Sequence, residues 1–338
     1  MSAAPIVHGG GITEAARQFG GAPSDWLDLS TGINPNPVAL PDIPQSAWHR
    51  LPDRHRFDAA SEAARDYYGS GAVPPLAVPG TQSVIQLLPR LLTRGRRAAI
   101  LGPTYGEYGR VLRAAGHAVD ELTDLDTVSD GHGVVIVVNP NNPTGRVIAP
   151  DALEALAEKV ARQGGYLLVD EAFGDTSPDT SVASLVERHE RLIVFRSFGK
   201  FFGLAGLRLG FVVASENIRA SFREWLGPWA VSGPALVIAA DLMARDTGAI
   251  RADIAQRKRG LDAVLRNAGL AISGGTPLFT LVAHPRAVDL HTALCRRQVL
   301  TRRFDYAPTW LRIGLAPDVA ADIRLAEALA GALSEVPA

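Results

Sequence analysis

Short apolar runs alternate with amphipathic stretches through the middle of the chain. The apolar runs lie at 98–101, 134–139, 166–173, 192–198 and 210–214, and the amphipathic stretches lie at 83–92, 106–115 and 150–163. Runs without polar alternation are typical of strands in a parallel sheet that helices cover on both faces. The pattern predicts a doubly wound α/β domain. No helix separates the last two runs, so the run at 210–214 is a candidate antiparallel strand.

The two ends of the chain have different patterns. Many Gly and Pro residues with weak periodicity predict an irregular arm over residues 1–45, with one short helix at 12–19. After residue 215 a helical region reaches Asn267, with breaks expected near Pro228 and Pro234. Two strands, at 278–283 and 310–315, and two helices, at 288–298 and 319–334, are then expected. We therefore expect a large domain at 46–240 and a smaller α+β domain at 241–338, with the arm packed on the smaller domain.

Composition narrows the function. The 338 residues carry 34 basic and 35 acidic side chains, a net charge of −1, which argues against a nucleic-acid partner. Cys295 is the single cysteine and the eight histidines have no metal-ligand spacing, so we expect no disulfide within the chain and no metal. The N-terminus lacks the pattern of a signal peptide, and the longest apolar runs are too short to span a bilayer. We expect a cytoplasmic protein with no membrane partner.

Polar residues follow the predicted strands. Segments with such residues lie at 79–82, 102–105, 139–145, 170–173 and 196–200. Ligands of open α/β sheets bind beyond the carboxyl ends of the strands, so we expect these segments to converge on one site. They offer an amine, a carboxylate, an amide, an aromatic face and several small donors. That set suits pyridoxal 5'-phosphate, which needs a lysine for its Schiff base and an acid for its ring nitrogen.

Each of these groups has an expected role. Lys200 is the Schiff-base lysine, Asp170 keeps the ring nitrogen protonated, and Tyr105 stacks on the ring. Asn142 bonds the ring oxygen O3′, and Phe173 lies in the same cofactor site. The expected phosphate ligands are Gly80, Thr81, Gln82, Ser197 and Arg208. We expect Lys200, Asp170 and Tyr105 to be the catalytic residues.

The same motifs carry a family resemblance. The segments NNPTG, DEAF and S-x-x-K, with an arginine eight residues beyond the lysine, resemble the fold-type I pyridoxal-phosphate enzymes of the aspartate aminotransferase superfamily. The resemblance runs from about residue 30 to residue 315. It implies a large domain with a mostly parallel seven-stranded sheet, a smaller α+β domain and a homodimer. It also implies that Arg312, in WLRIGLA, binds the substrate α-carboxylate.

The N-terminal segments indicate a branch of that superfamily. HGGGITEAARQFG (8–20) and WLDLSTGINPNP (26–37) resemble the threonine-phosphate decarboxylases of cobalamin biosynthesis. This resemblance implies decarboxylation of L-threonine O-3-phosphate to (R)-1-amino-2-propanol O-2-phosphate. The substrate ligands that it implies are His8, Gly32, Asn34, Asn142, Arg302 and Arg312. One departure is Leu51, which replaces a tyrosine that in many relatives reaches the partner subunit's cofactor phosphate.

Two other functions stay open. An aminotransferase of the histidinol-phosphate type uses the same catalytic residues, because the orientation of the substrate decides which bond to Cα breaks. A non-catalytic protein that keeps the fold is the third possibility, and the presence of Lys200, Asp170 and Arg312 argues against it. Glu171 is expected to be structural.

Overall fold

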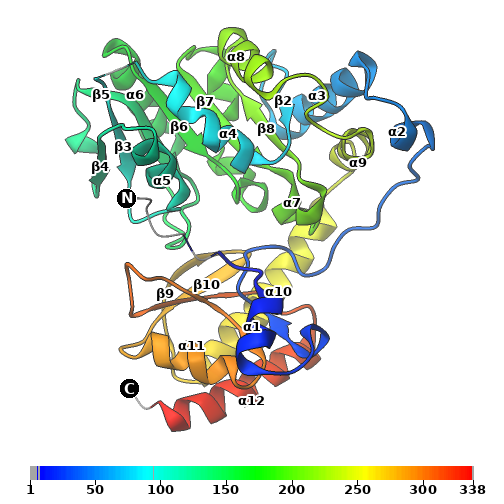
Figure 1. Ribbon diagram of the computed structural model, residues 1–338, viewed down its shortest axis with the longest axis vertical. Helices are drawn as coiled ribbons and strands as arrows, with labels where there is room; N and C mark the ends of the chain where they lie inside the picture. Colours follow the sequence, from blue (N-terminus) through cyan, green and yellow to red (C-terminus); the bar gives the residue numbers. More distant parts are fainter. Residues whose placement is uncertain (1–5, 7, 94, 337–338) are drawn as a thin grey trace. The chain divides into compact units, whose positions relative to one another are not determined.

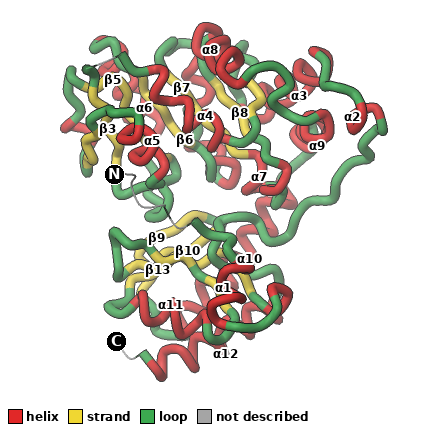
Figure 2. Tube along the Cα trace, in the orientation of Figure 1, coloured by secondary structure: helices red, strands yellow, loops and turns green. Residues whose placement is uncertain are grey.

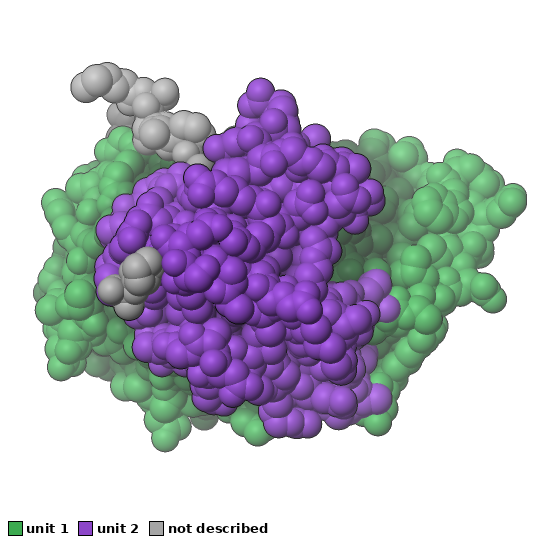
Figure 3. All heavy atoms as spheres, turned by 90° about the horizontal axis from the view of Figure 1, so that it is seen from below, with its two compact units in different colours: residues 1–4, 38–142, 146–246 green, residues 5–37, 143–145, 247–338 purple. Residues whose placement is uncertain are grey.

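A computed structural model describes residues 6, 8–93 and 95–336. The chain forms two compact units, coloured separately in Figure 3. The larger unit consists of residues 38–142 and 146–246. The smaller unit joins the described residues before 38 to residues 143–145 and to the chain after residue 246. The sequence suggests boundaries at residues 45 and 240, whereas the units divide after Pro37 and Asp246.

A seven-stranded sheet forms the middle of the larger unit (Figure 2). The strand order is β2-β8-β7-β6-β5-β3-β4, and only β8 runs antiparallel to its neighbours. The strands are β2 (Leu76–Val78), β3 (Arg97–Leu101), β4 (Val119–Leu122), β5 (His132–Val138), β6 (Tyr166–Asp170), β7 (Leu192–Ser197) and β8 (Gly210–Val213). The predicted α/β fold with a mostly parallel seven-stranded sheet is confirmed, including the antiparallel strand that follows β7.

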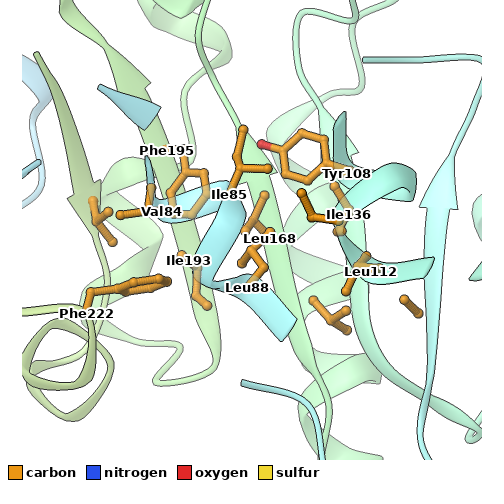
Figure 4. Packing of buried hydrophobic residues seen from close by; sticks show 14 of the residues in the cluster. Val84, Ile85, Leu88, Tyr108, Leu112, Ile136, Leu168, Ile193, Phe195 and Phe222 are labelled. Atoms are coloured by element: carbon orange, nitrogen blue, oxygen red, sulfur yellow. The ribbon is translucent and has the colours of Figure 1, made fainter. Parts of the chain in front are cut away.

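Helices cover both faces of this sheet (Figure 1). The helices of the larger unit are α2 (Ser46–His49), α3 (Arg54–Tyr68), α4 (Thr81–Leu87), α5 (Glu107–Ala114), α6 (Pro150–Arg162), α7 (Phe198–Phe201), α8 (Glu216–Leu226) and α9 (Gly233–Met243), of which α2 and α3 pack against α9. Alternate strand residues such as Ile136, Leu168 and Phe195 form a buried cluster with side chains of α4, α5 and α8 (Figure 4). Helix α6 packs on β5 and β6. Since side chains alternate along a strand, Asp170 points to the same face as Leu168.

The described residues of the smaller unit form two sheets and four α-helices. An antiparallel sheet has the order β12-β13-β10-β9, and a parallel pair joins β1 to β11. The strands are β1 (Leu27–Asp28), β9 (Ala271–Thr276), β10 (Phe279–Ala283), β11 (Val299–Leu300), β12 (Arg302–Arg303) and β13 (Trp310–Gly314). The helices are α1 (Ile12–Phe19), α10 (Gly248–Asn267), α11 (Ala287–Cys295) and α12 (Val319–Glu335). No helix among the described residues is long and apolar enough to cross a membrane.

Several elements differ from the sequence expectation. Strand β4 was not predicted because Asp120 and Glu121 interrupt its apolar pattern at the sheet edge. Helix α3 was not predicted because its buried positions before Tyr68 are alanines, although Asp53 caps it by accepting a hydrogen bond from Arg56 N at 3.3 Å. The break expected near Pro228 and Pro234 lies at 227–232, between α8 and α9. Pro234 itself lies in the first turn of α9, where its missing N–H costs nothing.

Candidate functional site

The carboxyl ends of β6 and β7 bring the predicted catalytic residues into one region. Asp170 is the last residue of β6 and pairs with Val138 of β5 and Phe195 of β7. Strand β7 ends at Ser197, and Lys200 follows in the single turn of α7. Lys200 Nζ lies 3.5 Å from Ser197 Oγ and 5.1 Å from the centroid of the Phe173 ring. The amine of Lys200 is therefore held at the end of the sheet.

Asp170 is buried and fully hydrogen-bonded. Its side chain is 4% exposed. The Tyr108 hydroxyl donates to Oδ2 at 2.7 Å, and Ala172 N donates to Oδ1 at 3.0 Å. Burial raises the pKa of Asp170 above the usual carboxyl value, while the charge of Lys200 and the two hydrogen bonds act in the opposite direction. The geometry suits a carboxylate whose orientation is fixed.

A hydrogen-bond chain holds Tyr105. Its hydroxyl donates to Gln82 Oε1 at 3.1 Å, and Gln82 Nε2 donates to Glu107 Oε2 at 2.7 Å. Because a carboxylate only accepts, Glu107 fixes the orientation of the Gln82 amide and makes Tyr105 the donor. Glu107 is itself buried, at 3% exposure, and pairs with Arg110.

The loop that carries Asn142 is tied to the loop before Tyr105. Thr104 Oγ1 donates to Asn141 Oδ1 at 2.6 Å, and Asn141 Nδ2 donates to the Pro103 carbonyl oxygen at 3.0 Å. These bonds join the ends of β3 and β5, which are neighbours in the sheet. The structure therefore brings the segments of Tyr105 and Asn142 together, as the sequence predicts for residues beyond the strand ends.

Four of the five predicted phosphate ligands converge around the start of α4. A Cβ built on Gly80, the residue before this helix, would lie 2.9 Å from Arg208 Nη2. A Cβ on Gly210 would lie 3.0 Å from Thr81 N, and Gly210 is the β-sheet partner of Ser197. Backbone N–H groups, hydroxyls and a guanidinium thus share a small space, which favours an anion. Gln82, the fifth, instead bonds Tyr105 and Glu107.

A buried ion network joins the end of β7 to the segment that follows β6. Arg196, 3% exposed, pairs with Glu171 and Asp175, and its guanidinium lies 4.3 Å from the centroid of the Tyr68 ring. Glu171 also accepts hydrogen bonds from Ser181 Oγ and Val182 N, each at 2.6 Å. Glu171 therefore has the structural position expected from the sequence.

In the smaller unit, Arg302 and Arg312 are Cα partners on adjacent antiparallel strands. Arg312 is 6% exposed and donates from Nη2 to the Ser30 carbonyl oxygen at 2.8 Å. Its guanidinium lies 4.9 Å from the Phe279 ring centroid. The guanidinium of Arg302 lies 5.3 Å from the Phe304 ring centroid. Two cations on one face of a sheet form a candidate site for an anion.

The N-terminal candidates of the smaller unit lie around Ser30. Gly10 N donates to Ser30 Oγ at 2.7 Å, and a Cβ on Gly9 would overlap the Ser30 carbonyl oxygen that Arg312 binds. The exposed His8 precedes this contact. Asn34 is buried, and its Oδ1 accepts a hydrogen bond from Asn36 N at 3.0 Å. Gly32, two residues before Asn34, is also buried.

Sequence reasoning did not identify Tyr108 or Glu107 as residues of this region. Tyr108 is fully buried, so its place in the amphipathic pattern of α5 marks it as a core residue. Tyr105 lies just before α5, and its ring centroid is 6.2 Å from that of Tyr108, a contact that no periodicity in the sequence indicates. Among the described residues, no group of three or more His, Cys, Asp or Glu side chains forms a metal site.

Comparisons with known proteins identify the family of the chain. Residues 24–329 match the family model of aminotransferase class I and II. The chain is 66% identical to the threonine-phosphate decarboxylase of Sinorhizobium sp. over 97% of this chain and 98% of the relative. It is 46% identical to the threonine-phosphate decarboxylase of Pseudomonas aeruginosa over 96% and 98%.

A solved structure, the histidinol-phosphate aminotransferase from Sinorhizobium meliloti in complex with pyridoxal-5'-phosphate, is similar with a TM-score of 0.78. Its sequence identity is 21%, and the match covers 98% of this chain and 96% of that chain. The likeness to this structure concerns the fold, and the relatives of high identity confirm the resemblance drawn from the motifs. The chain belongs to the aminotransferase class I and II family.

Proposed function

We propose that the protein decarboxylates L-threonine O-3-phosphate to (R)-1-amino-2-propanol O-2-phosphate, a component of the nucleotide loop of cobalamin. The observation that carries the proposal is 66% identity, over nearly the whole length of both chains, to a threonine-phosphate decarboxylase. A second relative with that name matches at 46% over a similar length. The reaction breaks the bond between Cα and the carboxyl carbon, releases carbon dioxide and adds a proton to Cα.

Pyridoxal 5'-phosphate is the proposed cofactor, and the larger unit fits it. The space between Gly80 and Arg208, too small for a Cβ, has the donors that a phosphate ester needs. The buried Asp170 is suited to a pyridine nitrogen, and the amine of Lys200 lies at the end of the neighbouring strand. When bound, the cofactor supplies the electron sink for the electron pair that the departing carboxylate leaves behind.

The residues of the chain then have distinct tasks. Asp170 would pair with the ring nitrogen, and Tyr105, whose hydroxyl bonds Gln82, would cover the ring face. Asn142 and Phe173 complete the ring site. Lys200 would hold the cofactor through its amine, and its Nζ would carry the proton that Cα receives. Glu107 stabilises the Gln82 amide by accepting its hydrogen bond, and Arg196 stabilises the end of β7 through its ion pair with Glu171.

The substrate has two anionic groups, and the smaller unit has two facing arginines. We assign Arg312 to the α-carboxylate and Arg302 to the substrate phosphate, with His8, Gly32 and Asn34 as further ligands. The register that places Arg302 opposite Arg312 supports this assignment. The phosphate gives the protein a means to select its substrate, since uncharged amino acids lack the second anion.

We propose that the protein acts as a homodimer in the cytoplasm. Large apolar side chains are exposed on the larger unit at Trp48, Leu51 and Trp229, with exposures of 66%, 66% and 55%. Helix α2, which carries Trp48, packs against α9, and Trp229 lies just before α9. Exposed apolar groups on neighbouring elements are typical of an interface between subunits. Light scattering after size-exclusion chromatography tests the dimer, and a monomer would contradict it.

The reaction itself is tested without any keto acid. Purified protein loaded with pyridoxal phosphate is mixed with L-threonine O-3-phosphate, and carbon dioxide release is measured. Many turnovers per site are expected. Absence of release, together with amino transfer from histidinol phosphate to 2-oxoglutarate, would overturn the decarboxylase in favour of the aminotransferase.

A further inference from the structure

Tyr108 is a buried polar residue to which the proposed function assigns no task. It lies in the first turn of α5, and its side chain is 0% exposed. Its ring lies in the apolar cluster with Ile85, Ile136 and Leu168 (Figure 4). A phenol in such surroundings needs a partner for its hydroxyl. That partner is Asp170 Oδ2, at 2.7 Å.

The direction of this hydrogen bond is fixed. Burial, followed by the neighbouring Asp170 charge, raises the pKa of Tyr108 well above the usual phenol value, so the hydroxyl keeps its proton. The carboxylate of Asp170 accepts, and its other oxygen, Oδ1, is taken by Ala172 N at 3.0 Å. Asp170 is therefore held in one orientation from two sides, by α5 and by its own loop.

The charged groups around Asp170 do not replace Tyr108. Burial is the largest influence on Asp170 and favours its neutral form, and Lys200, Tyr108, Ala172 N and Arg196 favour the ionised form. Lys200 has to give up its charge to react as an amine. Arg196 is committed to Glu171 and Asp175. Tyr108 is thus a fixed side-chain donor that stays available to the carboxylate throughout a reaction cycle.

We propose that Tyr108 is a positioning residue that keeps Asp170 ionised, so that the proton between Asp170 and the cofactor lies on the ring nitrogen. This inference rests on the proposed function, because it needs the cofactor in the site. Without the donated bond, the buried carboxylate competes for the proton, and the ring loses the positive charge that makes it a good electron acceptor. Tyr108 thereby acts on the reaction through Asp170, without contact with the substrate.

The test uses pyridoxal phosphate labelled with ¹⁵N at the ring nitrogen, bound to the protein and observed by NMR. In the unaltered protein the resonance should have the value of a protonated ring nitrogen near neutral pH. In Tyr108→Phe the resonance should move toward the unprotonated value. The ratio of protonated to unprotonated ring nitrogen should fall about tenfold or more, as expected for loss of a hydrogen bond to an ionised group. The kcat should fall by a similar factor, with KM nearly unchanged.

Two further variants separate this role from general loss of packing. Tyr68→Phe removes another buried hydroxyl from the same unit. Tyr68 is not among the groups that shift the pKa of Asp170, so this variant should leave the resonance unchanged. In an Asp170→Asn background, Tyr108→Phe should add no further shift. The proposal is overturned if the resonance is the same in the unaltered protein and in Tyr108→Phe. It is also overturned if Tyr108→Phe and Tyr68→Phe shift the resonance equally.

If Tyr108→Phe does not fold, 3,5-difluorotyrosine at position 108 keeps the ring and supplies a more acidic donor. At neutral pH the ring-nitrogen resonance should then keep the protonated value of the unaltered protein, and a shift toward the unprotonated value overturns the proposal. Failure of the unaltered protein to bind the labelled cofactor would instead overturn the proposed function together with this inference.

Discussion

Arg302 and Arg312 lie directly opposite each other on the antiparallel strands β12 and β13. Opposite residues of such a pair point to the same face of the sheet, and two like charges there are unfavourable. Arg312 is largely buried and is held by the Ser30 carbonyl oxygen. A bound anion would relieve this repulsion, so the register itself favours an anionic substrate.

Substitution of Arg302 tests that interpretation. Arg302→Gln keeps a polar side chain but removes the charge. We expect KM for L-threonine O-3-phosphate to rise about tenfold to a hundredfold, as for loss of one hydrogen bond to a charged group, with cofactor affinity unchanged. Steady-state kinetics and cofactor titration measure the two quantities.

Arg303 supplies the matched control for Arg302. It is the next residue of the same strand, so its side chain points to the other face, where it lies 3.6 Å from Asp305. Arg303→Gln should leave KM within about twofold, since exposed ion pairs contribute little. Equal effects of the two substitutions would show that general charge, not the Arg302 position, attracts the substrate.

Lys200 is one of three lysines in the chain, with Lys159 and Lys258. Lys200→Ala should abolish turnover and the visible absorbance of the cofactor joined to the protein amine, because Lys200 is the lysine in the helical turn directly after β7. Lys159→Ala, on α6, is the control and should retain both signals. Turnover in Lys200→Ala that matches the control would remove Lys200 from its assigned role.

The smaller unit should lose stability in mild acid through His291. This ring lies 2.9 Å from Thr301 Oγ1, and burial, then the charges of Arg303 and Arg302, lowers its pKa to about 4. The folded pKa is below the unfolded value, so the unfolded state binds more protons between these values. The stability that the neutral His291 ring contributes to the folded state is complete above about pH 6.5 and is lost as the pH falls toward 4.

Urea unfolding at pH 7.5 and pH 5 measures this effect. We expect the free energy of unfolding to fall by about 2 kcal/mol more in the unaltered protein than in His291→Gln over this interval. His49→Gln, an exposed histidine of α2, should behave like the unaltered protein. A pH dependence unaffected by His291→Gln would contradict the assignment.

The sequence predicts the candidate residues at the strand ends better than the residues of α5 that bond to them. Runs such as those of β5 and β6 are apolar on both faces, so they identify the sheet. Polar residues at the strand ends mark Asp170, the last residue of β6, and Lys200, after β7, as candidates. Tyr108 and Glu107 were missed because their roles depend on where α5 packs, which no local pattern encodes. Strand β12 was also missed, since two residues are too few for any periodicity, and with it the register of Arg302.

Gly80 provides a steric test of the proposed phosphate site. Its φ is +75°, and a Cβ there would lie 2.9 Å from Arg208 Nη2. Gly80→Ala should therefore displace the guanidinium and weaken cofactor binding about tenfold or more, as for loss of one charge-assisted hydrogen bond. Gly164→Ala, with φ +70° and nothing within 4 Å of an added Cβ, also places an alanine at positive φ but without the steric overlap. Equilibrium dialysis with pyridoxal phosphate compares the two, and equal losses of affinity would show that backbone strain, rather than the contact with Arg208, governs binding.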